Sequence, residues 1–258
     1  MTAGLAVGEL LRGWRERRRL TQLSLSLQAD VSARHLSFIE TGRSRPTSEM
    51  ILRLSEELEV PLRERNALLL AGGYAPAFPQ HGLDDPSLDA VRSALREVLA
   101  GHEPNPAVVI DQHWHLVEAN SGIGLFTASV APELLAPPIN VLRLSLHPDG
   151  MAPHILNLGE WRAHLLARLE RQAAQTADRE LAALRAELAG YPGDVEEGVH
   201  PRPHDVVVPL RYQHGDQELS FLSMTAVFGT PLDVTVAELA IESFYPADPA
   251  TTKFLRAM

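Results

Sequence analysis

The sequence predicts an all-α N-terminal domain of five helices, followed by an α+β domain with a five-stranded antiparallel sheet. Three observations support this fold class. Apolar residues recur at helical spacing in the first third of the chain, and short apolar runs of strand character begin at Ala107. A proline-containing stretch separates the two patterns. We therefore expect two domains, residues 1–75 and 87–258, joined by a linker over 76–86.

The first domain is predicted to contain five short helices. The first has a buried stripe at helical spacing, formed by Val7, Leu10, Leu11 and Trp14. Thr21, Ser32 and Thr47 precede the next three, where a side-chain hydroxyl can accept a hydrogen bond from an amide that the helix start leaves unpaired. Pro61 begins the fifth helix, where a missing amide costs nothing, and Gly72 ends it.

The second and third of these helices have the spacing of a helix-turn-helix pair. Leu25 and Ala29 lie on the buried face of the former, and Leu36 and Ile39 on the buried face of the latter. Asp30 lies in the turn, where it tolerates a left-handed backbone better than most residues. The opposite face of the third helix is then free to meet base edges in the major groove of DNA.

This segment resembles the helix-turn-helix of the Xre and lambda-repressor family. The positions in register are Gln22, Val31, Ser32, Leu36, Ile39, Glu40, Gly42 and Pro46. Two positions differ, because Asp30 replaces the usual Gly and Ser24 the acidic residue that would complete a capping box. The resemblance implies sequence-specific binding to double-stranded DNA, by a homodimer on an inverted-repeat operator. The alternative is an ordinary pair of packed helices.

The family motif also implies which residues contact DNA. They are Gln22, Ala33, Arg34, Ser37, Phe38, Arg43, Ser44 and Arg45. Gln22 is expected to bind a phosphate, and Phe38 to touch a thymine methyl group. Ala33, Arg34 and Ser37 are expected to face base edges. The three residues after the helix are expected to meet the DNA backbone or the neighbouring groove edge.

Charge and composition agree with a DNA partner for the N-terminal part. Residues 1–75 hold 11 arginines and 9 acidic residues, whereas residues 76–258 hold 12 basic and 24 acidic residues, for a net charge of −10. Such asymmetry is typical of a nucleic-acid-binding domain on an acidic partner domain. The absence of cysteine excludes disulfides and cysteine-held metals. No apolar run is long enough to cross a bilayer and no secretory signal is evident, so we expect a cytoplasmic protein without membrane association.

In the C-terminal part, a helix from Pro86 to Gly101 gives way to strands and shorter helices. The expected elements are strands 107–110 and 114–117, a short helix after Asn120, a helix over 141–146 after Asn140, a long helix over 159–188, and strands 206–212, 219–228 and 239–244. The tight turn 214–217 indicates a hairpin. This layout predicts helices on one face of the sheet, with room for a cavity between the layers.

The C-terminal part resembles the PAS-like ligand-binding domain of MmyB-like regulators. The matching segments are 105–120, 139–143, 147–148, 160–161 and the ending Ala-Ile-Glu-Ser-Phe-Tyr-Pro-Ala-Asp, together with 65–76 before the linker. The resemblance implies a one-component transcription regulator whose C-terminal domain binds an apolar small molecule, for which fatty acids are the usual suggestion. Ala119 replaces a frequent aromatic residue, which bears on the size of the cavity mouth.

Large apolar residues of these elements are candidates to line the ligand cavity. They are Trp114, Leu116, Phe126, Leu142, Leu146, Trp161, Leu165, Leu222, Met224 and Phe228. Each of them could equally be plain core. Arg143 is the first candidate to bind a ligand carboxylate and His147 the second. The alternative for Arg143 is a solvated position on its helix.

Metal and enzyme motifs are absent from the sequence. His113 and His115 lie two apart on an expected strand and could chelate a metal, but no carboxylate–histidine cluster at ligand spacing is evident. We therefore predict no metal site and no cofactor. No glycine-rich phosphate loop or Gly-x-Ser-x-Gly elbow is present, which predicts a protein that is not an enzyme. The alternative function is a DNA-binding regulator whose C-terminal domain is a protein-interaction module without a small-molecule ligand, with the apolar stretch 160–190 as its contact.

Overall fold

The computed structural model describes residues 6–192 and 207–258, which form two compact units. Unit 1 contains residues 1–82, 174–176 and 230–237, and unit 2 contains residues 83–173, 177–229 and 238–258. Residues 1–5 and the expected strand start at Val206 lie outside the described residues. Among the described helices, none combines the length and apolar character needed to cross a membrane.

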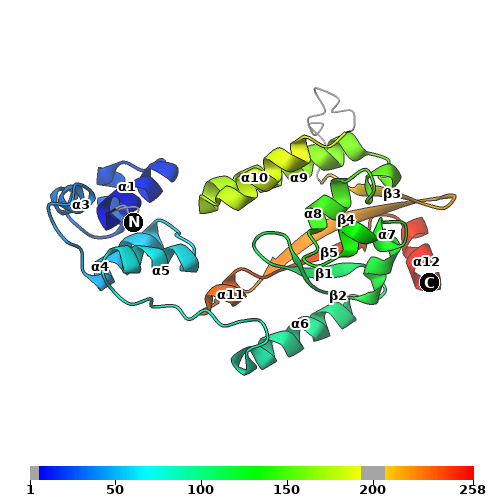
Figure 1. Ribbon diagram of the computed structural model, residues 1–258, viewed down its shortest axis with the longest axis horizontal. Coiled ribbons are helices and arrows are strands. Elements are labelled where there is room, and N and C mark those ends of the chain that lie inside the picture. The colour runs from blue at the N-terminus through cyan, green and yellow to red at the C-terminus, as the bar shows by residue number, and fades with distance from the viewer. Residues whose placement is uncertain (1–5, 193–206) are drawn as a thin grey trace. The chain divides into compact units, whose positions relative to one another are not determined.

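Unit 1 is built on five helices, as predicted (Figure 1). They are α1 (Val7–Arg17), α2 (Gln22–Gln28), α3 (Ala33–Glu40), α4 (Ser48–Glu57) and α5 (Leu62–Ala71). The hydroxyls of Thr21, Ser32 and Thr47 accept hydrogen bonds from the amides three residues further on, so each predicted cap is present. The shared core includes Leu11, Trp14, Leu25, Leu36, Ile39, Ile51, Leu54, Leu58 and Leu68.

The turn between α2 and α3 has the geometry expected of a helix-turn-helix. Asp30 has a φ of 51°, the left-handed conformation that glycine adopts without cost and aspartate at about 1 kcal/mol. The amide of Val31 then donates to the carbonyl of Ser26 at 2.9 Å, which closes the turn. Gly8 allows α1 to approach α3 closely, because a Cβ there would lie 2.1 Å from the carbonyl oxygen of Ile39.

A short helix distant in sequence completes unit 1. This helix, α11 (Val234–Ala237), contacts α5. The amide of Val234 donates to the carbonyl of Pro79 at 2.9 Å, and His81 Nδ1 lies 2.8 Å from Asp233 Oδ2. Residues 230–237 therefore hold the end of the proline-containing stretch.

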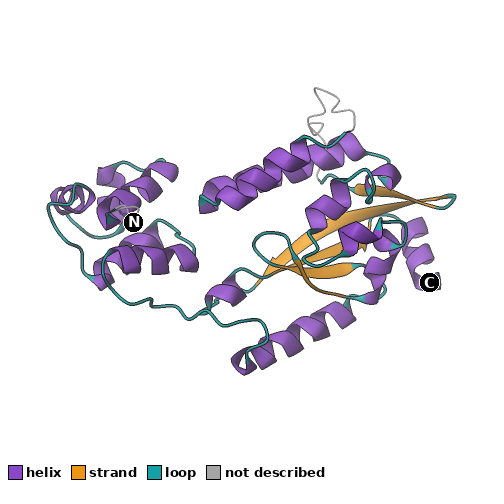
Figure 2. Cartoon of the chain, viewed as in Figure 1, coloured by secondary structure: helices purple, strands orange, loops and turns teal. Residues whose placement is uncertain are grey.

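Unit 2 contains the predicted five-stranded antiparallel sheet (Figure 2). Its strands are β1 (Ala107–Ile110), β2 (Leu116–Ala119), β3 (Leu210–His214), β4 (Gln217–Val227) and β5 (Ala240–Pro246). They are arranged in the order β2-β1-β5-β4-β3. The hairpin at 214–217 is confirmed, since His214 pairs with Gln217 and Leu210 with Phe221.

Helices cover both faces of this sheet, whereas we expected one covered face. On one face α6 (Asp89–Gly101) packs Leu95 and Leu99 against Ala107, Val109 and Ile241. The larger core lies on the other face, beneath α7 (Gly124–Thr127), α8 (Val141–Leu146), α9 (Leu158–Thr176) and α10 (Arg179–Ala189). Because β1 is buried on both faces, its sequence is continuously apolar rather than alternating.

Several elements differ from the prediction, including α11, which was not predicted. The expected helix over 159–188 is divided, because Ala177 has a φ of 61° and Asp178 accepts hydrogen bonds from the amides that begin α10. The strand expected to begin at Trp114 begins at Leu116, since Trp114 has a φ of 68° and belongs to the turn. A C-terminal helix, α12 (Pro249–Ala257), was not predicted, although Asp248 followed by proline is a typical helix start.

Candidate functional site

Helix α3 carries four of the residues predicted to contact DNA, namely Ala33, Arg34, Ser37 and Phe38. Leu36 and Ile39 are buried, whereas Arg34 is exposed and Ala33, Ser37 and Phe38 are half-buried. The guanidinium of Arg34 lies 5.3 Å from the centre of the Phe38 ring, and that of Arg43 lies 5.9 Å from it. Two cations are thus held beside one aromatic ring. This arrangement provides charge for phosphates and an apolar edge for a base methyl group.

Two of the other predicted DNA contacts have partners inside unit 1. Gln22 Nε2 donates to Glu40 Oε2 at 2.8 Å. Arg45 donates to the carbonyl of Gly72 at 2.8 Å and lies over the ring of Tyr74. Arg45 therefore ties the loop after α3 to the end of α5, while Ser44 in the same loop is half-buried.

The orientation of α3 is fixed by a buried charge network. Arg15 of α1 donates to both carboxylate oxygens of Glu40, with Nε–Oε1 at 2.7 Å and Nη2–Oε2 at 2.9 Å. Glu40 is 4% exposed, and its hydrogen bonds with Arg15 raise the pKa of that guanidinium. Because Gln22 shares the same carboxylate, one buried anion joins α1, α2 and the end of α3.

Unit 2 contains an apolar cavity between its sheet and the helices on the larger-core face. Its volume is about 90 Å³. Six residues predicted to line a ligand cavity do line it: Trp114, Leu116, Phe126, Leu142, Trp161 and Leu165. Phe126 is met edge-on by Tyr212, Phe221 and Phe244, with ring centres 5.2–5.3 Å apart. The cavity is smaller than the roughly 300–1,000 Å³ of typical ligand pockets, so a longer ligand requires lining side chains to move outward.

The other predicted ligand residues lie outside this lining. Leu146 is buried in the surrounding core. Leu222 and Met224, on β4, are 37% and 60% exposed, and Phe228 packs against the core on the opposite face. Successive side chains of β4 point to opposite faces of the sheet. Ser223 points into the cavity, so Leu222 and Met224 point away from it.

Arg143 and His147 are placed beside α10 rather than at the cavity. Arg143 donates to both carboxylate oxygens of Glu187 at 2.8 Å, and the two side chains are 41% and 38% exposed. This pairing lowers the pKa of Glu187. His147 meets the ring of Tyr191 edge-on, with ring centres 5.1 Å apart. Since the neighbouring Leu142 faces the cavity, Arg143 points to a different side of α8.

The cavity wall also contains a polar group that was not predicted from the sequence. Arg168 of α9 donates to Glu242 Oε2 at 3.0 Å and also pairs with Oε1 of that carboxylate. The hydroxyls of Ser223 and Thr225 donate to Glu242 at 3.2 and 2.8 Å. Arg168, Ser223 and Glu242 all line the cavity. The position of Arg168 could have been predicted from the sequence, because it follows Trp161 and Leu165 at helical spacing and so lies on the same face of the helix.

Aromatic rings and a histidine lie next to the Arg168–Glu242 pair in the cavity lining. The Arg168 guanidinium lies 4.5 Å from the centre of the Trp114 ring, a cation–π contact. His164, also in the lining, stacks on Trp161. Burial lowers the pKa of His164, and the positive charge of Arg168 lowers it further. The imidazole of His164 is therefore neutral at pH 7. Arg168 is thus the cation that balances the charge of Glu242 at the cavity.

Comparisons with known proteins identify both parts of the chain. A helix-turn-helix family model matches residues 11–65, and the MmyB-like transcription regulator ligand binding domain model matches residues 91–258. No curated protein matches the chain. A solved protein described as "Structure of an RNA-binding Light-Oxygen-Voltage Receptor" is 16% identical, with a TM-score of 0.27. That match covers 98% of this chain and 62% of the other chain.

The two family models correspond to the parts in which the structure places α3 and the cavity. The helix-turn-helix match includes the whole of α2 and α3, and the second match includes the sheet with its cavity. The second match spans more than half of the sequence. The chain therefore belongs to the family of MmyB-like transcription regulators, with a helix-turn-helix domain before its MmyB-like ligand-binding domain.

Proposed function

We propose that this protein binds a specific double-stranded DNA operator through α3 and changes its DNA affinity when a fatty acid enters the cavity of unit 2. The observation that carries the proposal is the apolar cavity with one neutralised ion pair in its wall, in a chain that also carries the Arg34–Phe38–Arg43 surface. In this proposal residues 1–75 bind DNA, 76–86 link the domains and 87–258 bind the ligand. The protein is a cytoplasmic regulator, because its DNA partner lies there, and it is not an enzyme.

DNA binding is proposed to require two copies of the chain. The N-terminal 75 residues carry 11 arginines against 9 acidic residues, so one copy attracts DNA only weakly. A homodimer would place two α3 helices about 34 Å apart on an inverted-repeat operator. Within each half-site Arg34 and Ser37 face bases, whereas Arg43 and Ser44 contact the backbone.

The ligand is proposed to bury its acyl chain among the apolar residues of the cavity. Each buried methylene contributes about 0.8 kcal/mol, so affinity should rise with chain length until the cavity cannot open further. For the carboxylate, Arg168 is the cation in the lining, whereas Arg143 would first have to leave Glu187. The carboxylate of a fatty acid that binds Arg168 competes with Glu242. Binding of the acid therefore replaces the Glu242 carboxylate by the ligand carboxylate at the Arg168 guanidinium.

A titration with saturated fatty acids and the matching alcohols tests this function. Melting temperature and operator affinity are measured for each chain length, and native mass spectrometry reports the number of chains and bound ligands. We expect native mass spectrometry to show a dimer. The melting temperature should rise with the length of the acyl chain, and the operator affinity should change as the ligand binds. A ligand alters DNA affinity only if it prefers one conformer of the protein. A flat response at all chain lengths contradicts the sensing function.

A protein-interaction module is the second candidate function for unit 2. The observation that favours it is a pair of exposed apolar side chains on one face of β4, where Leu222 and Met224 are 37% and 60% exposed. Exposed apolar side chains that lie together are typical of contact surfaces. A Met224→Ser variant with normal fatty-acid response but impaired regulation would favour this alternative.

A further inference from the structure

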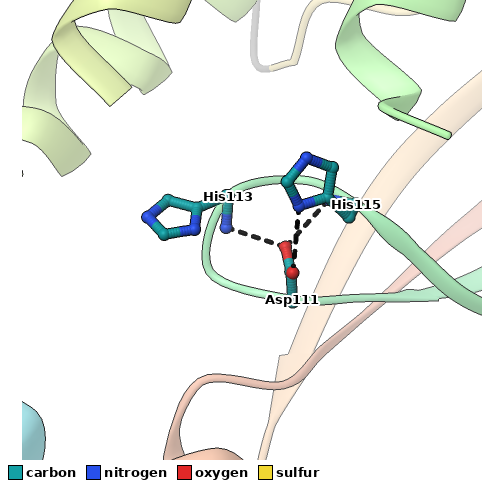
Figure 3. Close-up of side chains that lie close together, drawn as sticks. All are labelled: Asp111, His113 and His115. Atoms are coloured by element: carbon teal, nitrogen blue, oxygen red, sulfur yellow. Dashed lines mark hydrogen bonds and ion pairs between the residues drawn. The ribbon is translucent and has the colours of Figure 1, made fainter. Parts of the chain in front are cut away.

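The turn between β1 and β2 brings together an acidic residue and two histidines (Figure 3). Asp111, His113 and His115 each offer one ligand atom, and these atoms lie within 4.8 Å of one another. Asp111 Oδ1 accepts hydrogen bonds from the amides of His113 and His115, both at 2.8 Å. Its other oxygen lies 3.1 Å from His115 Nδ1. The carboxylate is therefore held in place beside both imidazoles.

The conformation of the turn explains why the sequence did not show this cluster. We expected the histidines on a strand, but both precede β2, and Trp114 between them has a φ of 68°. Trp114 is 4% exposed, and its indole Nε1 donates to Gln172 at 2.9 Å. A buried and hydrogen-bonded ring thus anchors the middle of the turn, so the two flanking imidazoles do not depend on a mobile loop.

A second carboxylate supports His113 from the side away from Asp111. His113 Nε2 lies 2.8 Å from Asp178 Oδ2, and Glu180 lies 3.7 Å from the same nitrogen. Histidine ligands of metals usually give their second ring nitrogen to a carboxylate, which fixes the tautomer and the ring. With Nε2 engaged in this way, Nδ1 of His113 is left as the ligand atom.

We propose that Asp111, His113 and His115 form a binding site for a divalent transition-metal ion, with Zn²⁺ as the ion that fits best. Imidazole ligands select Zn²⁺ and its neighbours over Mg²⁺ and Ca²⁺, which take oxygen ligands. Three protein ligands leave one position of a tetrahedral ion open. Ligand atoms around zinc lie about 3.3 Å apart, given bonds of roughly 2.0–2.1 Å. The 3.1 Å between Asp111 Oδ2 and His115 Nδ1 is close to this spacing, and the ligand atom of His113 lies within 4.8 Å of the other two.

The proposed site is next to the cavity but separate from it. Trp114 lines the cavity, while Asp111, His113 and His115 do not. A bound ion would join the β1–β2 turn to the start of α10 through His113 and Asp178. The inference does not depend on the proposed function, since metal binding can be measured without DNA or fatty acid.

The test is titration of the full-length protein with Co²⁺, whose visible absorption reports histidine and carboxylate ligation, followed by displacement with Zn²⁺. We expect one equivalent of Co²⁺ per chain. His113→Ala and His115→Ala should each lower the affinity at least tenfold. Asp178→Asn should lower it about 10–100-fold, the usual effect of a lost supporting carboxylate, because asparagine still caps α10. His214→Ala, a half-buried histidine of the β3–β4 hairpin, is the matched control and should bind normally.

Circular dichroism and melting without metal show whether each variant is folded. Asp111→Asn is a further variant, because its amide oxygen can still accept the two backbone hydrogen bonds while the ligand charge is lost. The proposal is overturned if the wild-type protein binds no Co²⁺, or if the folded His113, His115 and Asp178 variants bind with wild-type affinity.

Discussion

Arg15 and Glu40 face each other across α1 and α3 and form two hydrogen bonds, at 2.7 and 2.9 Å. Their side chains are only 10% and 1% exposed. The desolvation of a buried pair offsets much of its attraction, whereas removing one partner is destabilising because the other charge is left buried and unpaired. In this protein the pair holds the helix that carries the predicted base contacts.

Glu40→Ala is expected to destabilise unit 1 by about 3 kcal/mol, since it strands the charge of Arg15 in a buried site. Urea unfolding followed by circular dichroism measures this change. Arg12→Ala is the control, because Arg12 forms an exposed pair with Glu16. Its removal should leave the unfolding midpoint unchanged. Equal midpoints for Glu40→Ala and Arg12→Ala would show that the buried pair has no structural role.

Arg34→Ala is expected to cost roughly 1–3 kcal/mol of specific DNA binding and to relax selectivity at one operator position. Arg43→Ala should weaken binding to all sequences alike and reduce the salt slope by about one. Fluorescence anisotropy over a set of single-base operator variants separates the two effects. Arg211→Ala, an exposed arginine of β3, serves as the control. Uniform weakening by Arg34→Ala would reassign that residue to the DNA backbone.

Glu242→Gln is expected to increase the affinity for fatty acids without a similar increase for alcohols of the same length. The substitution removes the anion that competes for Arg168. The ratio of acid to alcohol affinity should rise about tenfold, which corresponds to a charge-assisted hydrogen bond of roughly 1.5 kcal/mol. Calorimetric titration measures both ligands. Arg143→Ala should leave the ratio of acid to alcohol affinity unchanged. A lower ratio in that variant would show that Arg143, and not Arg168, donates hydrogen bonds to the ligand carboxylate.

Asp233→Asn is expected to reduce the acid sensitivity of unit 1. Burial raises the pKa of Asp233, but its hydrogen bonds with His81 and the amides of α11 lower it overall. A carboxyl group whose folded pKa is lowered stabilises the protein above its ordinary pKa of 3.8. That stabilisation is lost as the pH falls through the lower folded value. Melting temperatures between about pH 2 and 6 should therefore converge for wild type and variant at the acid end. A constant difference across this range would contradict the assignment.

Local signals in the sequence predicted most of the fold. Thr21, Ser32 and Thr47 cap the helices that they were expected to cap, because an N-cap depends on residues within one turn. The division between α9 and α10 was missed, since Ala177 gives no sequence signal for a left-handed conformation. The apolar periodicity on either side continues through this break, which is why one helix was expected.

The candidate sites were less predictable because they depend on distant partners. Arg143 and Arg168 both lie on helices that place apolar side chains in the cavity lining, but Arg143 pairs with Glu187 at the surface and Arg168 pairs with Glu242 at the cavity. Glu242 lies 74 positions from Arg168 in the sequence. The Asp111–His113–His115 cluster likewise depends on the backbone conformation of Trp114. Neither relationship follows from spacing within one element.

Helix α11 belongs to unit 1 although the strands before and after it, β4 and β5, belong to unit 2. During synthesis the ribosome releases the first 82 residues long before it releases this helix. At about 5–20 residues per second, the intervening 150 or so residues take roughly 8–30 s to make. The five N-terminal helices can fold in that interval, while Pro79 and His81 still lack their partners. Unit 1 can therefore assemble in two stages, and the second waits until residues 230–237 have been made.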